Sequence, residues 1–396
     1  MTTLTLQGRF EALTHLLARY HWAWSPLAFK HKTLPWEVSH PELSAWLVAL
    51  SDAEVDILET DSQRLAHQLR RFLPPTASLL DLCDLPRLSP TCAPAALKPP
   101  PPGVPGRKWS QIESFAARLP EVSGPWIEWC AGKGHLARAI SQLKDTPLQC
   151  LEWDLSLCAK GQAMAAKERL PLTFSPTDVL QSPALHPGSN VVALHACGDL
   201  HRALLHQGIL HRATSISYSP CCYHRTTAPT YSPLSRLGQQ LLSFPLSAED
   251  LRLAVHETVT APAHDQRKRV QNSVWRLAFD ELQRDLGGVD HYKPLPSFRA
   301  GELSLPFEEF CAALCQQHQL PLPSRSLLQQ TLKRGEARHR EVTRKDLLRH
   351  LFRRPLEVWL VLDGALHLQE RGYQVKVGTF CDRSTSPRNL MVQGLP

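Results

Sequence analysis

The chain has 396 residues, of which 43% are hydrophobic and 20% charged, a balance typical of a globular protein with one or two domains. Its formal net charge of +7 leans toward an anionic partner, although the distribution of the charge matters more than its sum. The 33 prolines fall largely in connecting segments, which indicates stiff loops rather than general disorder.

The composition also bears on targeting and redox state. The first residues have no basic start followed by an apolar block, so we expect no signal peptide. The most apolar late run, residues 358–366, is short and interrupted by Asp363, so we expect no membrane span. We expect a cytoplasmic protein, and its odd number of cysteines, 11, argues against a disulfide framework.

The pattern along the chain predicts five segments. Residues 1–98 predict a helical N-terminal domain, and the proline-rich stretch 99–106 predicts a stiff linker. Strands and helices alternate over 107–225, which indicates a parallel sheet with right-handed crossovers. Residues 226–354 predict a helical, basic insertion, and 355–396 predict a last helix and an antiparallel hairpin. The overall prediction is an α/β fold.

The predicted sheet has five strands before the insertion and two after it. Helices are expected at 109–119, 135–143, from about 155 to 169, from about 200, and at 356–371. The strands are predicted at 125–130, 148–153, 172–174, 191–195, 215–219, 373–381 and 389–393.

A glycine-rich turn follows the first predicted strand. Gly132 and Gly134 lack side chains there, so a ligand can approach the backbone and the free N–H groups of the next helix. With Ala137 in third place the spacing also fits a dinucleotide fingerprint, so an NAD-binding oxidoreductase stays open.

Acidic residues follow the next two strands. Glu152 and Asp154 come roughly 20 residues after the glycines, where an acid can accept hydrogen bonds from both hydroxyls of a ribose. The other interpretation is that one of them only caps the following helix. We favour Asp154 as the ribose ligand. Asp178 follows the third strand, at a position where its carboxylate could accept a hydrogen bond from the amino group of an adenine.

Polar residues crowd the ends of the fourth and fifth strands. Residues 195–200 read His-Ala-Cys-Gly-Asp-Leu, and residues 220–225 read Pro-Cys-Cys-Tyr-His-Arg. In parallel sheets ligands bind beyond the carboxyl ends of the strands. The pattern therefore predicts either a metal site or a polar substrate pocket.

Zinc is one candidate ligand for this cluster. Cys197, Cys221, Cys222 and His224 could supply four ligands. However, adjacent cysteines on extended backbone point in opposite directions, and there is no Cys-x-x-Cys pair. We therefore expect no metal, and thiols packed beside a cofactor instead.

Together these motifs resemble a branch of the class I S-adenosylmethionine-dependent methyltransferases. Residues 128–136 (Glu-Trp-Cys-Ala-Gly-Lys-Gly-His-Leu), 195–200 and 221–224 (Cys-Cys-Tyr-His) are similar to methyltransferase-like proteins with a Cys-Gly-x-x-Leu fourth motif. They are also similar to eukaryotic tRNA 2′-O-methyltransferases, which have His-His where this chain has Tyr-His. The resemblance covers about residues 104–225 and 355–394. It implies a Rossmann-like sheet and S-adenosyl-L-methionine as cofactor.

The resemblance also implies roles for single residues. His195, Asp199 and His224 are the candidate catalytic groups, and histidine suits proton removal because it is partly neutral at pH 7. Substrate would meet Cys221, Cys222 and Tyr223. The implied cofactor-binding residues are Glu128, Cys130, Gly132, Lys133, Gly134, Glu152, Asp154, Asp178, His195 and Cys197.

Two basic stretches indicate the acceptor. Residues 331–354 hold nine Lys/Arg against three Asp/Glu, and residues 264–276 hold four against one. Clustered cations suit a phosphate backbone, whereas a solvated helix face is the plainer interpretation. We expect RNA as the substrate, with tRNA one candidate. A protein or small-molecule acceptor and a non-catalytic RNA-binding module stay open. The residues expected to contact phosphates are Arg338, Arg340, Arg344, Lys345 and Arg349.

Overall fold

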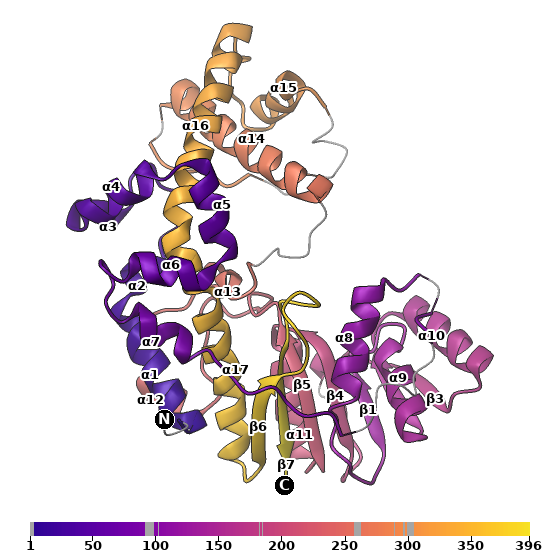
Figure 1. The fold of residues 1–396 in the computed structure, drawn as a ribbon. Coiled ribbons are helices and arrows are strands. Elements are labelled where there is room, and N and C mark those ends of the chain that lie inside the picture. Colours follow the sequence, from indigo (N-terminus) through magenta and orange to yellow (C-terminus); the bar gives the residue numbers. More distant parts are fainter. Residues whose placement is uncertain are drawn as a thin grey trace. The chain divides into compact units, whose positions relative to one another are not determined.

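The computed structural model describes every residue except 1–3, 92–98, 102, 182, 184, 257–262, 289, 296–297 and 299–304. The chain forms two compact units, each assembled from separate segments (Figure 1). The sheet unit contains Met1–Arg19, Ala77–Thr260 and Phe352–Pro396, and the helical unit contains Tyr20–Thr76 and Ala261–Leu351. Parts of the predicted N-terminal domain, linker and insertion therefore lie outside the described residues.

The sheet unit is built on a seven-stranded sheet with the strand order β3-β2-β1-β4-β5-β7-β6. The strands β1 to β5 pair in parallel, β7 runs antiparallel to β5, and β6 runs antiparallel to β7. This topology confirms the predicted α/β fold with a Rossmann-like sheet and a terminal hairpin. The strands are β1 (Trp126–Trp129), β2 (Leu148–Glu152), β3 (Leu172–Pro176), β4 (Asn190–Cys197), β5 (Ser215–Cys221), β6 (Gln374–Thr379) and β7 (Leu390–Leu395).

Helices cover the sheet, so its central strands are buried on both faces, as is usual for parallel strands between crossovers. All residues of β1 and β5 are buried. The helices of the sheet unit are α1 (Leu6–Arg19), α8 (Gly106–Ala116), α9 (His135–Lys144), α10 (Leu155–Glu168), α11 (Asp199–Leu210), α12 (Arg236–Leu241), α13 (Ala248–Leu253) and α17 (Arg353–Gln369), with a short 3-10 turn at Val179–Gln181.

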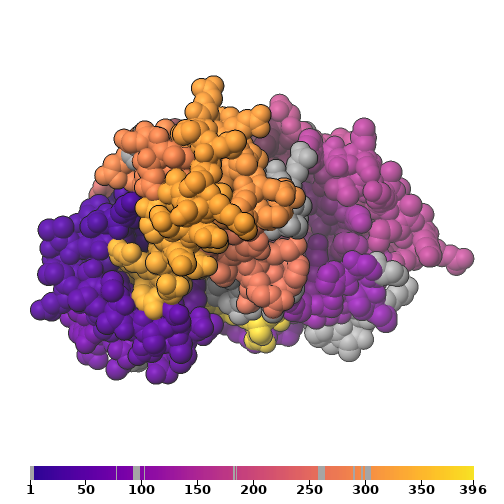
Figure 2. All heavy atoms as spheres, turned by 90° about the horizontal axis from the view of Figure 1, so that it is seen from above, coloured from indigo at the N-terminus to yellow at the C-terminus, as the bar shows by residue number. Residues whose placement is uncertain are grey.

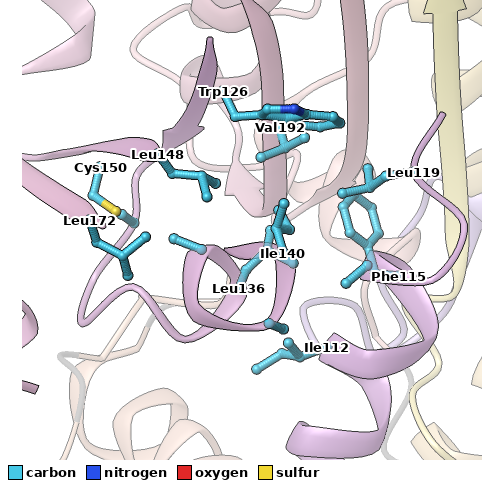
Figure 3. Packing of buried hydrophobic residues seen from close by; sticks show 14 of the residues in the cluster. Ile112, Phe115, Leu119, Trp126, Leu136, Ile140, Leu148, Cys150, Leu172 and Val192 are labelled. Carbon is cyan, nitrogen blue, oxygen red and sulfur yellow. The ribbon is translucent and has the colours of Figure 1, made fainter. Parts of the chain in front are cut away.

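A core cluster joins α8 and α9 to the sheet (Figure 3). Phe115 on α8 and Ile140 on α9 are fully buried, and Trp126 and Val192 of the strands belong to the same cluster. Burying one such side chain contributes about 1.5–3 kcal/mol. This packing holds the N-terminus of α9 at the edge of the sheet where the glycine loop lies.

The first helix belongs to the sheet unit although it opens the chain. The Phe10 ring stacks on Trp359 of α17 with the ring centroids 5.1 Å apart. The Trp359 indole donates a hydrogen bond to Thr14 Oγ1 at 2.8 Å. The compact units therefore divide the first 91 residues at Arg19 and Thr76 rather than keeping them together, because α1 finds its apolar partner on α17.

The segment after β5 is also fixed to α17, through one buried carboxylate. Asp363 accepts hydrogen bonds from the Tyr231 hydroxyl at 2.6 Å, the Leu234 N–H at 2.7 Å, and both the N–H and hydroxyl of Ser235. The first part of the predicted insertion therefore packs within the sheet unit.

The helical unit is centred on α16 (Arg325–His350), which packs along α14 (Ala263–Gly287) and contacts α2, α4 and α5. Gly335 permits the close crossing, because a Cβ there would lie 2.6 Å from that of Ala278 on α14. Figure 2 shows the atoms of residues 20–76 against α16. The other helices are α2 (His21–Trp24), α3 (Pro35–Ser39), α4 (Pro41–Ala49), α5 (Asp52–Thr60), α6 (Ser62–Leu69) and α15 (Phe307–Gln317), with α7 (Thr76–Asp81) starting at the boundary between the units.

Within the described ranges, no helix combines the length and apolar character needed to cross a membrane.

Candidate active site

The loop after β1 turns sharply through three left-handed residues. Cys130, Gly132 and Gly134 have φ angles of 57°, 59° and 68°, and Gly134 is the residue before α9. A Cβ on Gly132 would meet nothing within 4 Å, whereas a Cβ on Gly134 would lie 2.5 Å from the Phe174 ring. Gly132 therefore faces open space, and Gly134 is required by internal packing.

The two acids after β2 have different partners. Glu152 is buried, and its carboxylate accepts hydrogen bonds from the Gly132 N–H at 2.8 Å and the Asp154 N–H at 3.1 Å. Asp154 instead caps α10 by accepting from the N–H groups of Ser156 and Leu157. Glu152, rather than the favoured Asp154, is thus the acid turned toward the glycine loop.

Glu128 lies in β1 just before this loop and Cys130 lies within it, and burial favours the uncharged form of both side chains. Glu128 accepts a hydrogen bond from the Ala137 N–H in the first turn of α9, and burial raises its pKa to about 8. Burial, reinforced by the nearby carboxylates, raises the pKa of the Cys130 thiol to about 12. Lys133 and Asp178 are exposed, and Asp178 accepts from the Leu180 N–H directly after β3.

The end of β4 is distorted at a predicted site residue. The pairing with β5 shifts between Leu194 and Ala196, and the intervening His195 has a φ of 70°. A left-handed backbone at a residue other than glycine is unusual. Here it interrupts the regular pairing of β4 with β5 at the end of the strand. Both β4 and β5 run two residues beyond their predicted ends, so Cys197 and Cys221 lie within the strands.

A side chain from α8 orients His195. Its Nε2 lies 2.9 Å from Gln111 Oε1, and the Gln111 amide nitrogen donates to Ser386 Oγ at 3.0 Å and to the Arg388 carbonyl at 3.3 Å. The carbonyl can only accept, so the Gln111 oxygen faces the ring and Nε2 carries the proton. Burial lowers the pKa of His195 to about 4, so the ring is neutral and Nδ1 keeps its lone pair.

Sequence reasoning missed Gln111 and Ser386. Gln111 is one residue in a predicted amphipathic helix, and Ser386 lies in a predicted turn 275 residues later. Neither carries a local signal, because their relation to His195 arises only when α8 and the hairpin pack together.

The thiols at the ends of β4 and β5 converge. Cys197 and Cys221 are register partners with their Sγ atoms 3.3 Å apart. Cys222 has a φ of 45°, and the three Sγ atoms all lie within 4.8 Å of one another. The prediction that the adjacent thiols point apart is wrong, because the chain leaves the extended conformation at Cys222.

A cavity of about 320 Å³ lies beside the same strand ends. Asp199 and Tyr223 line it, together with His201 and Arg202, which the sequence interpretation did not select. In the part of the chain that the structure describes, three buried atoms around it have no hydrogen-bond partner: His201 Nδ1, Arg202 Nη1 and the Tyr223 hydroxyl. Asp199 itself accepts from the Thr227 N–H at 2.9 Å. Of the predicted catalytic and substrate groups after β4 and β5, Asp199 and Tyr223 therefore line one cavity, whereas Cys221 and Cys222 belong to the thiol cluster.

The predicted phosphate-binding residues lie on α16 of the helical unit, where most have partners within that unit. Arg338 is buried and pairs with Asp280 and Glu281. The other pairings are Lys345 with Glu37 and Glu341, Arg344 with Asp52, and Arg349 with the Trp24 carbonyl. Arg340 is exposed. The count of nine cations against three acids in residues 331–354 left out the acids elsewhere in the chain, such as Asp280 and Glu281, that pair with these cations.

A Rossmann-like sheet, a glycine loop after its first strand and an antiparallel last strand define an α/β protein, a fold class in which ligands bind at the carboxyl edge of the parallel strands. Residues 107–229 match a family model described as a methyltransferase domain. The matched residues include the glycine loop, both acids after β2 and the cysteine cluster.

Two solved structures match part of this chain. One is the glycopeptide N-methyltransferase MtfA complexed with S-adenosyl-L-methionine, at 20% identity over 31% of this chain and 59% of that one, with a TM-score of 0.24. The other is coclaurine N-methyltransferase bound to N-methylheliamine and S-adenosylhomocysteine, at 12% identity over 53% and 62%, with a TM-score of 0.25. This chain thus covers less than two thirds of each.

Proposed function

We propose that this chain is an S-adenosylmethionine-dependent methyltransferase that acts on RNA. The observation that carries the methyltransferase assignment is the loop after β1, within the segment that matches a methyltransferase domain. Its backbone turns in the left-handed region, Gly132 faces open space, and the buried Glu152 carboxylate lies beside it. These features suit a nucleoside ligand with a charged amino-acid part.

The residues around the loop fit separate parts of that cofactor. Glu152 would accept from the ribose hydroxyls, and Asp178 would meet the adenine amino group at the end of β3. Glu128 holds the first turn of α9 through the Ala137 N–H and so positions the loop. Gly132, Lys133 and Cys130 would border the methionine part.

The cofactor, when bound, supplies a methyl group already activated on a sulfonium. The chain must then align the acceptor and, for a weak nucleophile, remove its proton. His195 is held neutral with Nδ1 free to accept a hydrogen bond, so it suits orientation of an acceptor N–H or O–H. Asp199 and His224 are the other candidates for this role.

The RNA acceptor is supported by exposed cations that remain on the helical unit. Arg267 on α14 and Arg340 on α16 are exposed and line a groove of about 700 Å³. Val270 and Leu332 form part of its apolar lining. Cations bordering an apolar groove suit a single strand, whose phosphates are charged and whose bases have apolar faces.

Cofactor binding is tested by calorimetry of the full chain with S-adenosylhomocysteine and with NAD. The expected result is a saturable response to S-adenosylhomocysteine and a far weaker one to NAD. Binding of NAD without a response to S-adenosylhomocysteine would overturn the assignment in favour of an oxidoreductase.

The acceptor is tested with a charge-reversed pair, Arg267→Glu with Arg340→Glu. RNA affinity should fall, and the log–log salt slope should flatten by about 1.4, at about 0.7 per lost phosphate contact. The matched control is Lys160→Glu with Lys167→Glu, two exposed lysines of α10 that change the net charge equally. Equal RNA binding by both pairs, or no salt-sensitive binding by the parent, would contradict the proposal.

A second candidate is methylation of a small polar molecule, which the cavity beside Asp199 favours. Its volume of about 320 Å³ falls within the usual range for small-ligand sites, and three buried polar atoms there are unpaired among the described residues. Transfer of labelled methyl groups into cell extract separates the two candidates. Label released by ribonuclease supports RNA, and label in the low-molecular-weight fraction supports a small acceptor.

A further inference from the structure

The geometry points to a zinc site formed by Cys197, Cys221 and Cys222 at the ends of β4 and β5. Their ligand atoms lie within 4.8 Å of one another, and one pair of sulfurs is 3.3 Å apart. Three thiolates at about 2.3 Å from a tetrahedral zinc ion lie about 3.8 Å from each other. Small side-chain rotations therefore suffice to place all three around one ion.

Backbone contacts hold the three cysteines together. The Gly198 N–H donates to the Cys221 carbonyl at 3.0 Å, and the Asp199 N–H donates to the Arg225 carbonyl at 3.0 Å. Gly198 has a φ of 52°, and a Cβ there would lie 1.8 Å from the Arg225 oxygen. The loops after the two strands are thus in direct backbone contact. Such preorganisation limits the ordering that ion binding requires.

His224 is the fourth donor in this proposal, which takes it out of the acceptor-orienting role. Its side chain must turn toward the sulfurs on binding, because among the described residues the group within 4.8 Å consists of the three cysteines alone. His224 follows Cys222 by two residues, and its Nδ1 is buried without a hydrogen-bond partner in the described part of the chain. An unpaired buried nitrogen is unfavourable, and coordination would satisfy it. Three thiolates and one imidazole form a common zinc ligand set.

A disulfide explains the cluster less well than a metal does. A bond between Cys197 and Cys221 would use two sulfurs and leave Cys222 unexplained beside them. It would also require an oxidant, which zinc binding does not. Soft thiolate ligands select zinc over magnesium or calcium.

The site is tested without turnover, so its outcome is separate from that of the proposed methyl transfer. The full chain is purified from zinc-supplemented cells, dialysed against metal-free buffer, and measured by plasma mass spectrometry. We expect about one zinc per chain. Replacement by Co²⁺ should give the sulfur-to-metal charge-transfer absorption of thiolate ligands.

Variants assign the ligands. Cys197→Ser and Cys222→Ser should lose the bound zinc and weaken the charge-transfer band, and His224→Ala should retain zinc with lower affinity for Co²⁺. The matched control is Cys83→Ser, because Cys83 is buried outside the cluster and donates to the Leu79 carbonyl, a bond that serine can keep. Circular dichroism confirms that each variant is folded.

Three results would overturn the site. One is a parent without zinc that also gives no thiolate band with Co²⁺. Another is equal zinc in Cys83→Ser and Cys222→Ser, and the third is a Cys197–Cys221 disulfide in the freshly purified chain. Unchanged Co²⁺ affinity in His224→Ala would overturn the fourth ligand.

Discussion

The helical unit and the strand ends of the sheet unit differ in how their buried polar side chains are paired, although single atoms such as Asp280 Oδ1 lack a hydrogen-bond partner in the helical unit too, among the described residues. In the helical unit, Arg338 and Lys345 are buried and meet carboxylates from other helices. At the strand ends, burial keeps His195 neutral and leaves the Tyr223 hydroxyl without a partner among the described residues. Paired groups hold a fold together, whereas unpaired groups are available to a ligand. A count of basic residues along the sequence does not distinguish these two uses.

The largest expected effect is on the stability of the helical unit, where buried cations are paired with carboxylates. Arg338→Met should destabilise the helical unit by about 3–5 kcal/mol, because Asp280 and Glu281 would lose a buried partner. Arg340→Met is the control on the same helix, and its exposed position predicts a change within about 0.5 kcal/mol. Urea unfolding followed by circular dichroism measures both. Equal midpoints would show that the pairing of Arg338 contributes nothing to stability.

The next effect concerns the two acids after β2. Glu152→Gln should weaken S-adenosylhomocysteine binding at least tenfold, because hydrogen bonds to a charged group contribute about 1.5–3 kcal/mol. Asp154→Asn should bind almost like the parent, because asparagine is an equally good helix cap. Calorimetry compares them. A loss confined to Asp154→Asn would restore Asp154 as the ribose ligand.

The two loop glycines should separate stability from binding. Gly134→Ala should lower stability by roughly 1–3 kcal/mol, because its backbone is left-handed and the new Cβ meets Phe174. Gly132→Ala has the same backbone strain but no such contact, so its melting temperature should be higher than that of Gly134→Ala. It should also bind the cofactor less tightly than the parent does. Thermal melting with and without S-adenosylhomocysteine gives both quantities. The reverse order of melting temperatures would mean that Phe174 does not constrain the loop.

The effect that is smallest at each step of its measurement, one pH unit at a time, is a pH dependence at Glu128. Burial raises its pKa to about 8, above the usual value of 4.5, so the folded state binds the proton more tightly than the unfolded state. The stability from the protonated form is therefore complete below pH 4.5 and is lost as the pH rises through about 8, by about 1.4 kcal/mol per unit at most. Glu128→Gln should lack this loss. If the free energy of unfolding changed with pH in the same way for parent and variant between pH 5 and 8, this role of Glu128 would be contradicted.

The sequence was informative wherever the signal was local. The strand–helix alternation, the glycine loop and the terminal hairpin all follow from short-range patterns, and the structure confirms the fold that they predict. The orientations of the Asp154 and Glu152 side chains could not be predicted from local sequence. They depend on whether each carboxylate accepts from a helix end or from the glycine loop.

The remaining differences come from partners far along the chain. Arg338 on α16 meets acids of α14, and α1 meets α17, at separations of 57 residues or more. The convergence of the three thiols depends on the left-handed backbone of Cys222. A cysteine at that position gives no indication in the sequence of a left-handed conformation. Composition and periodicity cannot encode such contacts, because they exist only after the elements have packed.

The interleaved order of the segments has a consequence for biosynthesis. Residues 20–76 emerge from the ribosome long before α14 and α16, the helices against which they pack. Likewise, β5 exposes an open edge until β7, at Leu390–Leu395, has been translated. Neither unit can complete its fold while the nascent chain is short. An unpaired central strand is a template for intermolecular pairing, so the interval before β7 appears is when the chain most needs protection from aggregation.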